Sequence, residues 1–198
     1  RLPANAVEAV TKDDSDLVRR QREYLRKTHF NLIKTRMRAL HGKNLVFVQC
    51  ANNSKFWAWF DERRKRDWDL FLNCYAGDVE KAYAAEYVCK QVGTKFTGIL
   101  NCWLNCRGLF DLYENIFFID DDIVFNFADI SSFFRAMTSA GLDLAQPSLS
   151  TKSHCVWQVF FNQKKTGSRK TNGVEIMMPA LSKTARDILL PYFIYSIS

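Results

Sequence analysis

The sequence predicts an α/β fold, with a mostly parallel sheet, helices on both faces of that sheet, and a basic helix before it. Apolar runs typical of strands alternate with amphipathic segments along most of the 198 residues. Several of these runs are continuous, as in strands that are buried on both faces. The composition is 47% hydrophobic and 14% aromatic, which is enough for a substantial core.

The N-terminal segment is predicted as a tail followed by a helix. Over residues 14–40, apolar residues recur on one helical face while Arg and Lys occupy the other, and Gly42 is suited to end the helix. We therefore expect residues 1–42 to form a tail and a basic amphipathic helix, and residues 43–198 to form the main domain. Such a helix either packs on the domain or lies on an anionic membrane surface.

The first half of the main domain alternates strands with helices. Its first two strands are predicted at Asn44–Cys50 (NLVFVQC) and Trp68–Cys74 (WDLFLNC), because each apolar run is followed by turn residues. A helical stretch between them extends to about Arg66. After the second strand, residues 80–91 are predicted as a helix and residues 95–100 as a short strand.

The second half continues the same alternation. A helix at 100–112 precedes an apolar run, and a later helix has Asp129 as its expected N-cap and Gly141 as its stop. The predicted strands of this half are 116–122, 142–147, 156–161 and 173–178. Its later helices are 130–139 and a final one from Ser182 to about Leu190.

The segment IFFIDDD, at 116–122, is the most informative part of the chain. Its apolar residues run directly into Asp120, Asp121 and Asp122, at the end of a strand where open α/β sheets place ligands. Three adjacent carboxylates repel one another, and a divalent cation removes that repulsion. Two carboxylates that hold Mg²⁺ or Mn²⁺ against substrate phosphates are a common arrangement. The alternative is an Asp-rich turn after a strand.

Bulk properties and absent motifs narrow the function classes. Neither GxGxxG nor GxxxxGK[ST] follows any predicted strand, so phosphate binding would rely on a metal ion and on Lys or Arg. The net charge of +7 suits an anionic partner such as a nucleotide or a membrane surface, and we expect no nucleic acid partner. The six cysteines lack zinc-site spacing, which favours free thiols in a reducing compartment.

Three segments resemble the GT-A class of nucleotide-sugar glycosyltransferases: IFFIDDDIVF, LDLAQPSLS and GVEIMMPALSK. The resemblance covers about residues 44 to 195 and is closest to an uncharacterised domain family of bacteria and plants. It implies a GT-A fold, and a transferase that moves a sugar from a nucleotide-sugar donor to a glycan or other hydroxyl acceptor with Mn²⁺ or Mg²⁺. Relatives in this class continue beyond the final helix, so we expect the catalytic domain to be incomplete at its C-terminal end.

The resemblance also assigns roles to individual residues. Asp120 and Asp122 would form the DxD pair that holds the metal, with Asp120 also near the ribose or sugar and Asp122 neutralising the leaving diphosphate. Glu175 would be the catalytic base or would orient the acceptor hydroxyl. The donor would contact the polar residues that follow the first two strands and one basic residue of the loop at 150–172, namely Asn52, Asn53, Asp78 and Arg169.

Other interpretations remain open for these residues and for the whole chain. Glu175 is equally suited to pair with Arg169 or Lys170, and His154 is a candidate metal ligand from a loop. A haloacid-dehalogenase-like phosphatase would use Asp120 as nucleophile and Asp122 as acid, and a non-catalytic binding module on the same fold is a further alternative. We expect a cytoplasmic protein with peripheral membrane contact, and a Golgi-lumen domain is the alternative location.

Overall fold

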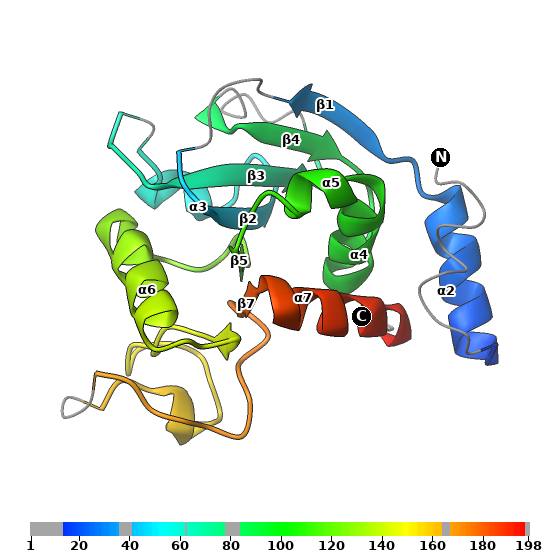
Figure 1. Cartoon of the computed structure of the whole chain (residues 1–198). Helices are drawn as coiled ribbons and strands as arrows, with labels where there is room; N and C mark the ends of the chain where they lie inside the picture. The colour runs from blue at the N-terminus through cyan, green and yellow to red at the C-terminus, as the bar shows by residue number, and fades with distance from the viewer. Residues whose placement is uncertain (1–13, 36–40, 62, 78–83, 164–166, 197–198) are drawn as a thin grey trace.

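A seven-stranded sheet forms the centre of the molecule (Figure 1). The computed structural model describes residues 14–35, 41–61, 63–77, 84–163 and 167–196. The strands are β1 (Asn31–Thr35), β2 (Asn44–Cys50), β3 (Trp68–Cys74), β4 (Tyr87–Lys90), β5 (Asn115–Ile119), β6 (Leu144–Ala145) and β7 (Ala180–Ser182). The helices are α2 (Asp16–Lys27), α3 (Phe56–Trp59), α4 (Lys95–Asn105), α5 (Arg107–Phe110), α6 (Phe127–Ser139) and α7 (Lys183–Leu189), with short 3₁₀ turns η2 (Gln158–Phe160) and η3 (Leu190–Tyr195).

The sheet is mixed, which corrects the expectation of a mostly parallel one. Its order is β1-β4-β3-β2-β5-β7-β6, and only the central four strands run parallel to one another. β1 pairs antiparallel with β4 at one edge of the sheet. β7 runs opposite to β5 because the chain comes back along β5 from its carboxyl end, where the carbonyl oxygens of Met177 and Pro179 accept hydrogen bonds from Asp120 and Phe118.

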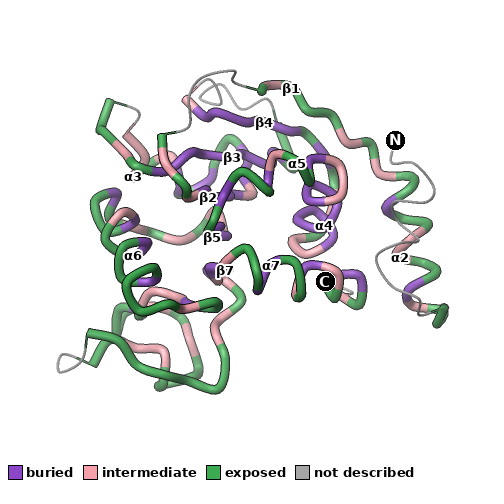
Figure 2. Tube along the Cα trace, viewed as in Figure 1, coloured by how far each residue is buried: buried purple, intermediate pink, exposed green. Residues whose placement is uncertain are grey.

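Helices cover both faces of the sheet, as the sequence predicts. One apolar cluster joins the strands to α2, α4, α5, α7 and η3, and a second joins their other face to α3 and α6. Figure 2 shows the central strands buried along their length while the outer turns of the helices are exposed. All seven residues of β3 are buried. This sandwich holds the strand ends of the central sheet in fixed positions.

The N-terminal helix is much shorter than predicted. α2 ends at Lys27, and Asn31–Thr35 forms an edge strand where the sequence predicts continued helix; residues 36–40 lie outside the described part of the chain. Val18 and Leu25 of α2 are fully buried in the first apolar cluster. The apolar face of α2 is therefore occupied inside the domain, and only its basic face is available to an outside surface.

Two further predictions between β3 and β5 are wrong. Tyr87–Lys90, in the predicted helix 80–91, forms β4, and the described residues of that range begin at 84. Lys95–Asn105 is helical throughout, so the predicted strand at 95–100 does not exist. The helix between β2 and β3 is limited to Phe56–Trp59.

The C-terminal third has fewer strands than predicted. Within 156–161 the chain forms the turn η2 and a single bridge from Phe161 to Leu149, and residues 173–178 approach β5 without forming a regular strand. The predicted strand at 142–147 is limited to Leu144–Ala145. Asn126 rather than Asp129 caps α6, whereas Ser182 caps α7 as expected.

The structure also bears on the membrane and thiol predictions. Among the described residues, no helix combines the length and apolar character that a membrane crossing requires. All six cysteines are free thiols, and five of them are buried. The Sγ atoms of Cys50 and Cys74 lie 3.9 Å apart where β2 and β3 end side by side.

Candidate functional site

The three aspartates lie at the switch point of the sheet. From β2 the chain winds through β3 to β4 on one side, and then returns to place β5 on the other side of β2. In open α/β sheets, ligands bind at the carboxyl ends of the two strands where this reversal occurs. Here these ends carry residues 51–54, after β2, and residues 120–122, after β5. The prediction that the acidic segment lies at the carboxyl end of a buried strand is therefore confirmed.

Asp120 is the inner acid of the site. Its Oδ1 atom lies 2.6 Å from the ammonium nitrogen of Lys95, and both side chains are largely buried, with 28% and 19% of their surface exposed. Burial raises the pKa of the Asp120 carboxyl above its usual range; the Lys95 ammonium opposes this rise, and the carboxylates of Asp122 and Asp121 add to it. The Lys95 ammonium thus stabilises the charged form of the Asp120 carboxyl against the cost of its burial.

Asp121 has a structural position. Its Oδ2 atom accepts hydrogen bonds from the hydroxyls of Ser54, at 2.6 Å, and Tyr75, at 2.8 Å. Its backbone carbonyl accepts from the amide of Phe56 at 3.1 Å. These contacts join the loops after β2, β3 and β5. Asp121 is therefore committed to holding the edge of the sheet together.

Asp122 is the outer acid. Its side chain is exposed, and its carboxylate has no hydrogen bond or ion pair with any residue that the structure describes. Because it follows Asp121 in a turn closed by a hydrogen bond from Ile123 to the Asp120 carbonyl, it remains next to Asp120. Asp122 is therefore available to a ligand, Asp120 is ion-paired with Lys95, and Asp121 is bound by two hydroxyls.

Lys95 is a site residue that the sequence analysis missed. It is the first residue of α4, and its ammonium also donates to the carbonyl oxygen of Ile176. Burial lowers the pKa of this ammonium, although the carboxylates of Asp120, Asp122 and Glu175 oppose that shift. The only signal in the sequence is a lysine that follows a Thr N-cap at a helix start. That signal does not indicate contacts 25 and 81 residues away.

The residues predicted to bind the donor lie partly beside the acids. Asn52 and Asn53 are exposed in the loop after β2. The Asn52 amide lies against Gly77, where an added Cβ would approach its nitrogen to 2.9 Å and where the backbone has a positive φ of 72°. Asp78 lies outside the described residues. Asn52 thus lines the same edge as Asp121, although nothing in the structure assigns it a ligand.

Glu175 lies on the opposite flank of the acidic segment. Its backbone amide donates to Gln146, its Oε1 accepts from the amide of Ile176 at 3.0 Å, and its Oε2 lies 3.7 Å from the Cys155 thiol. Arg169 is exposed, and the described residues show no ion pair between Glu175 and either Arg169 or Lys170. The structural alternative for Glu175 therefore finds no support, and Arg169 is not brought to the acids.

Two hollows, each of about 510 Å³, are lined by residues around the site. The Glu175 hollow is lined by Glu175, Met177 and residues 153–156, which include His154. The Tyr75 hollow lies between α2 and the ends of β3 and β4, and Tyr75 forms part of its wall. Because the Tyr75 hydroxyl also bonds Asp121, this residue connects the Tyr75 hollow to the acidic segment. The three aspartates themselves are not among the lining residues of either hollow.

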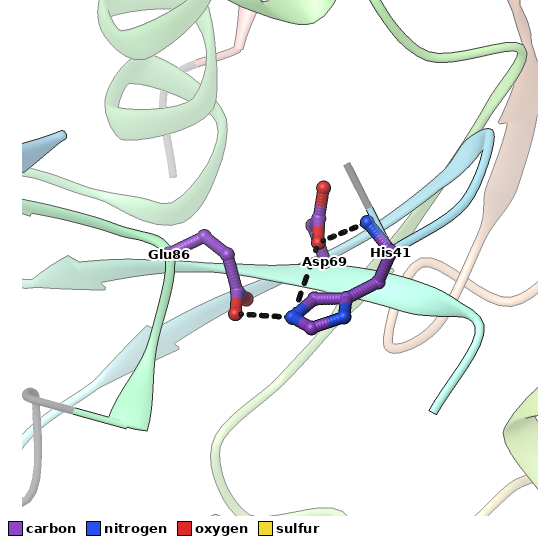
Figure 3. A group of neighbouring side chains, drawn as sticks. All are labelled: His41, Asp69 and Glu86. Carbon is purple, nitrogen blue, oxygen red and sulfur yellow. Dashed lines mark hydrogen bonds and ion pairs between the residues drawn. The ribbon is translucent and has the colours of Figure 1, made fainter. Parts of the chain in front are cut away.

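A second polar cluster lies at the other end of β3 (Figure 3). Among the described residues, His41, Asp69 and Glu86 form the one group of three potential ligands within 4.8 Å of each other. However, Arg66 binds both oxygens of Glu86, at 2.6 and 2.7 Å, and Asp69 accepts from the Tyr113 hydroxyl at 2.6 Å. The acids are therefore already paired, and the cluster is better suited to a structural role than to a cation.

The chemistry of this chain is inferred from its own residues and geometry, since comparisons with known proteins add nothing to them. No protein-family model matches the chain, and no curated protein matches it.

Proposed function

We propose that this chain is a divalent-metal-dependent glycosyltransferase that uses a nucleotide-sugar donor. The observation that supports it most directly is the pair Asp120 and Asp122 at the switch point, one carboxylate held by a cation and the other free. The proposal assigns the donor to the hollow lined by Tyr75 and the acceptor to the hollow lined by Glu175.

The residues present fit Mn²⁺ or Mg²⁺. A positively charged group, the Lys95 ammonium, already contacts a carboxylate oxygen of Asp120 and the carbonyl oxygen of Ile176. Carboxylate and carbonyl oxygens are the ligands that hard divalent cations prefer, and such ions usually complete their coordination with water and substrate phosphates. Asp120 and Asp122 would hold the ion. When bound, it would neutralise the charge that develops on the leaving diphosphate.

The position of Glu175 supports a role for this residue in proton transfer. In an inverting transfer, an acceptor hydroxyl oxygen bonds to the anomeric carbon, and the bond from that carbon to the diphosphate breaks with its electron pair on the phosphate oxygen. The hydroxyl proton must pass to a base within about 3 Å. Glu175 lines the hollow formed with Met177 and residues 153–156, and its Oε2 atom has only a weak thiol contact. The proposal therefore assigns that proton to Glu175. The proposed acceptor is a glycan.

The finer fold assignment is part of the same proposal. A GT-A-like arrangement is supported by the parallel central strands, by the loop after β2 beside the acids, and by α4 and α5 preceding the apolar strand β5. The mixed edges of the sheet do not conflict with it, because the site depends only on the central strands. Peripheral membrane contact, if made by α2, would use basic residues on its exposed face, such as Arg20.

A thermal-shift panel tests the proposal. UDP, GDP, CMP and their sugars are added with and without Mn²⁺ to the native chain, to Asp122→Ala and to Asp129→Ala, an exposed acid on α6 that serves as the matched control. We expect one nucleotide class to raise the melting temperature only with Mn²⁺, equally in the native chain and in Asp129→Ala, and not in Asp122→Ala. At ligand concentrations about 100-fold above Kd, the gain is about 2.7 kcal/mol.

Other outcomes would select the alternatives. If Mn²⁺ with orthovanadate or phosphate stabilises the chain and nucleotides do not, the acids belong to a phosphatase that uses Asp120 as nucleophile. If no combination changes the melting temperature, the transferase proposal is wrong and the fold serves as a binding module.

A further inference from the structure

Lys95 occupies a position that a divalent cation would need. Its ammonium contacts Asp120 at 2.6 Å and the carbonyl oxygen of Ile176, the residue that follows Glu175. The positive charge of Lys95 therefore lies directly against the inner acid of the site. No other lysine or arginine in the described residues forms an ion pair with Asp120, Asp121 or Asp122.

A divalent ion and the Lys95 ammonium compete for the Asp120 carboxylate. A bound Mg²⁺ would lie about 2.1 Å from a carboxylate oxygen. An ammonium 2.6 Å from that same oxygen would then face a like charge across a very short gap. An ion at Oδ1 would therefore displace Lys95, and an ion at the other oxygen of Asp120 would weaken the attraction between the carboxylate and Lys95. The four flexible methylenes of the lysine side chain allow it to move.

A displaced Lys95 has one class of acceptor that fits it better than the acids. Once a divalent ion neutralises Asp120 and Asp122, a phosphate group on the ion brings new negative charge to this edge. The neighbouring carboxylates of Asp121 and Glu175 already accept hydrogen bonds of their own. Lys95 begins α4, an 11-residue helix whose first amides and N-terminal dipole also favour an anion. The lysine and the helix start thus favour the same ligand.

We propose that Lys95 is the phosphate-binding cation of this site, held by Asp120 in the metal-free chain and transferred to the donor diphosphate when a divalent ion binds. This inference rests on the proposed function, because it requires a diphosphate ligand at the acids. It assigns Lys95 two opposite effects. Lys95 competes with the metal alone, and it strengthens the binding of a metal–diphosphate complex.

The test is Lys95→Met, which keeps the length of the side chain and removes its charge. Binding of Mn²⁺ alone is measured from the electron paramagnetic resonance signal of the free ion, and binding of inorganic pyrophosphate with Mg²⁺ is measured by calorimetry. We expect Lys95→Met to bind Mn²⁺ several-fold more tightly than the native chain. Pyrophosphate affinity should fall about tenfold or more, the usual worth of a hydrogen bond to a charged group.

Two further variants serve as controls. Lys183→Met removes another lysine at the first position of a helix, away from the acids, and should change neither affinity. Lys95→Arg keeps the charge and should retain most of the pyrophosphate binding. If Lys95→Met fails to fold, Lys95→Arg still tests whether a positive charge at this position is sufficient.

The outcomes separate this inference from the proposed function. If the native chain binds pyrophosphate with Mg²⁺ but Lys95→Met and Lys95→Arg match it in both assays, the inference is wrong and the transferase proposal stands. If both affinities fall together in Lys95→Met and Lys95→Arg alike, Lys95 only supports the structure of the site. If the native chain binds neither Mn²⁺ nor pyrophosphate, both proposals are wrong.

Discussion

At the scale of single residues, three adjacent aspartates have three different environments. Asp120 is partly buried against Lys95, Asp121 accepts two hydroxyl hydrogen bonds, and Asp122 is exposed. The alternation arises because the chain turns directly after β5, so that consecutive side chains point to different surroundings. A substitution at each position should therefore have a different consequence.

Asp121→Ala should destabilise the fold more than Asp122→Ala. The first change leaves the hydroxyls of Ser54 and Tyr75 without their acceptor, which costs about 1–3 kcal/mol in the free energy of unfolding. The second removes an exposed side chain and should cost within about 0.5 kcal/mol. Urea denaturation of both variants measures the difference. Equal losses would contradict the structural role of Asp121.

Tyr75 makes the stability depend on alkaline pH. Burial, together with the hydrogen bond to Asp121 and the charge of that carboxylate, raises the pKa of Tyr75 to about 12, whereas an unfolded tyrosine has a pKa of about 10. The folded chain then holds this proton more tightly than the unfolded chain does. The contribution of the hydroxyl is fully present below about pH 10 and is lost as the pH rises through about 12.

Tyr75→Phe tests this dependence, because it removes the titrating hydroxyl and keeps the ring. The native chain should exceed the variant in free energy of unfolding by a constant amount up to about pH 10, and by a decreasing amount above it. Urea titrations of both proteins at a series of pH values give this difference directly. A difference that does not change with pH would show that Tyr75 has the same pKa in both states.

The sequence predicts some site residues and not others for a physical reason. Asp120 and Asp122 are found because a carboxylate cluster next to a buried apolar run is visible locally. The contact of Lys95 with Asp120 and the contacts of Asp121 with Ser54 and Tyr75 exist only after four loops meet at one edge of the sheet. Nothing in the local pattern around Lys95 indicates them.

At the scale of elements, burial decides which predictions are confirmed. The strands β2 and β3 have the predicted bounds, and β5 lies in its predicted place, because continuous apolar runs fit only the middle of a covered sheet. β4 lies where the sequence predicts a helix. The preceding residues include several alanines, which favour helix, and pairing with β3 outweighs that propensity. In α4, position 98 favours glycine, because a Cβ there would lie only 2.6 Å from the Gln49 side chain.

The placement of α2 on the sheet gives a prediction for the N-terminal segment. Leu25→Ala should lower the free energy of unfolding by about 2–5 kcal/mol, because this side chain is fully buried in the core cluster of the main domain. Leu32→Ala, on the exposed edge strand β1, is the matched control and should cost less than about 1 kcal/mol, since 37% of Leu32 is exposed. Chemical denaturation with a single transition would show that the segment unfolds with the sheet. A Leu25→Ala loss no larger than that of Leu32→Ala would mean that α2 is not part of this core.

At the scale of the whole molecule, charged clusters lie at opposite ends of the central sheet. The acids after β5 lie at its carboxyl edge, while Asp69 is the second residue of β3 and binds His41 near the amino edge. The five residue-to-residue steps from Asp69 to Cys74, at the end of β3, span roughly 17 Å at about 3.3 Å per step. The amino-edge acids already have Arg66 and Tyr113 as partners. Within the described part of the chain, Lys95 is the one cation paired with the acids at the carboxyl edge.

This asymmetry predicts that a divalent ion acts at one end only. His41→Asn removes a potential ligand of the amino-edge cluster, and Asp122→Asn removes one at the carboxyl edge, in each case from a side chain that is partly or fully exposed. Titration of Mn²⁺ with the favoured nucleotide should raise the melting temperature of His41→Asn as much as that of the native chain, and should leave Asp122→Asn unchanged. Loss of the response in His41→Asn would place the ion in the cluster of Figure 3 instead. That result would overturn the assignment of the ion to Asp120 and Asp122. It would also require the ion pair between Arg66 and Glu86 to open so that a cation can enter.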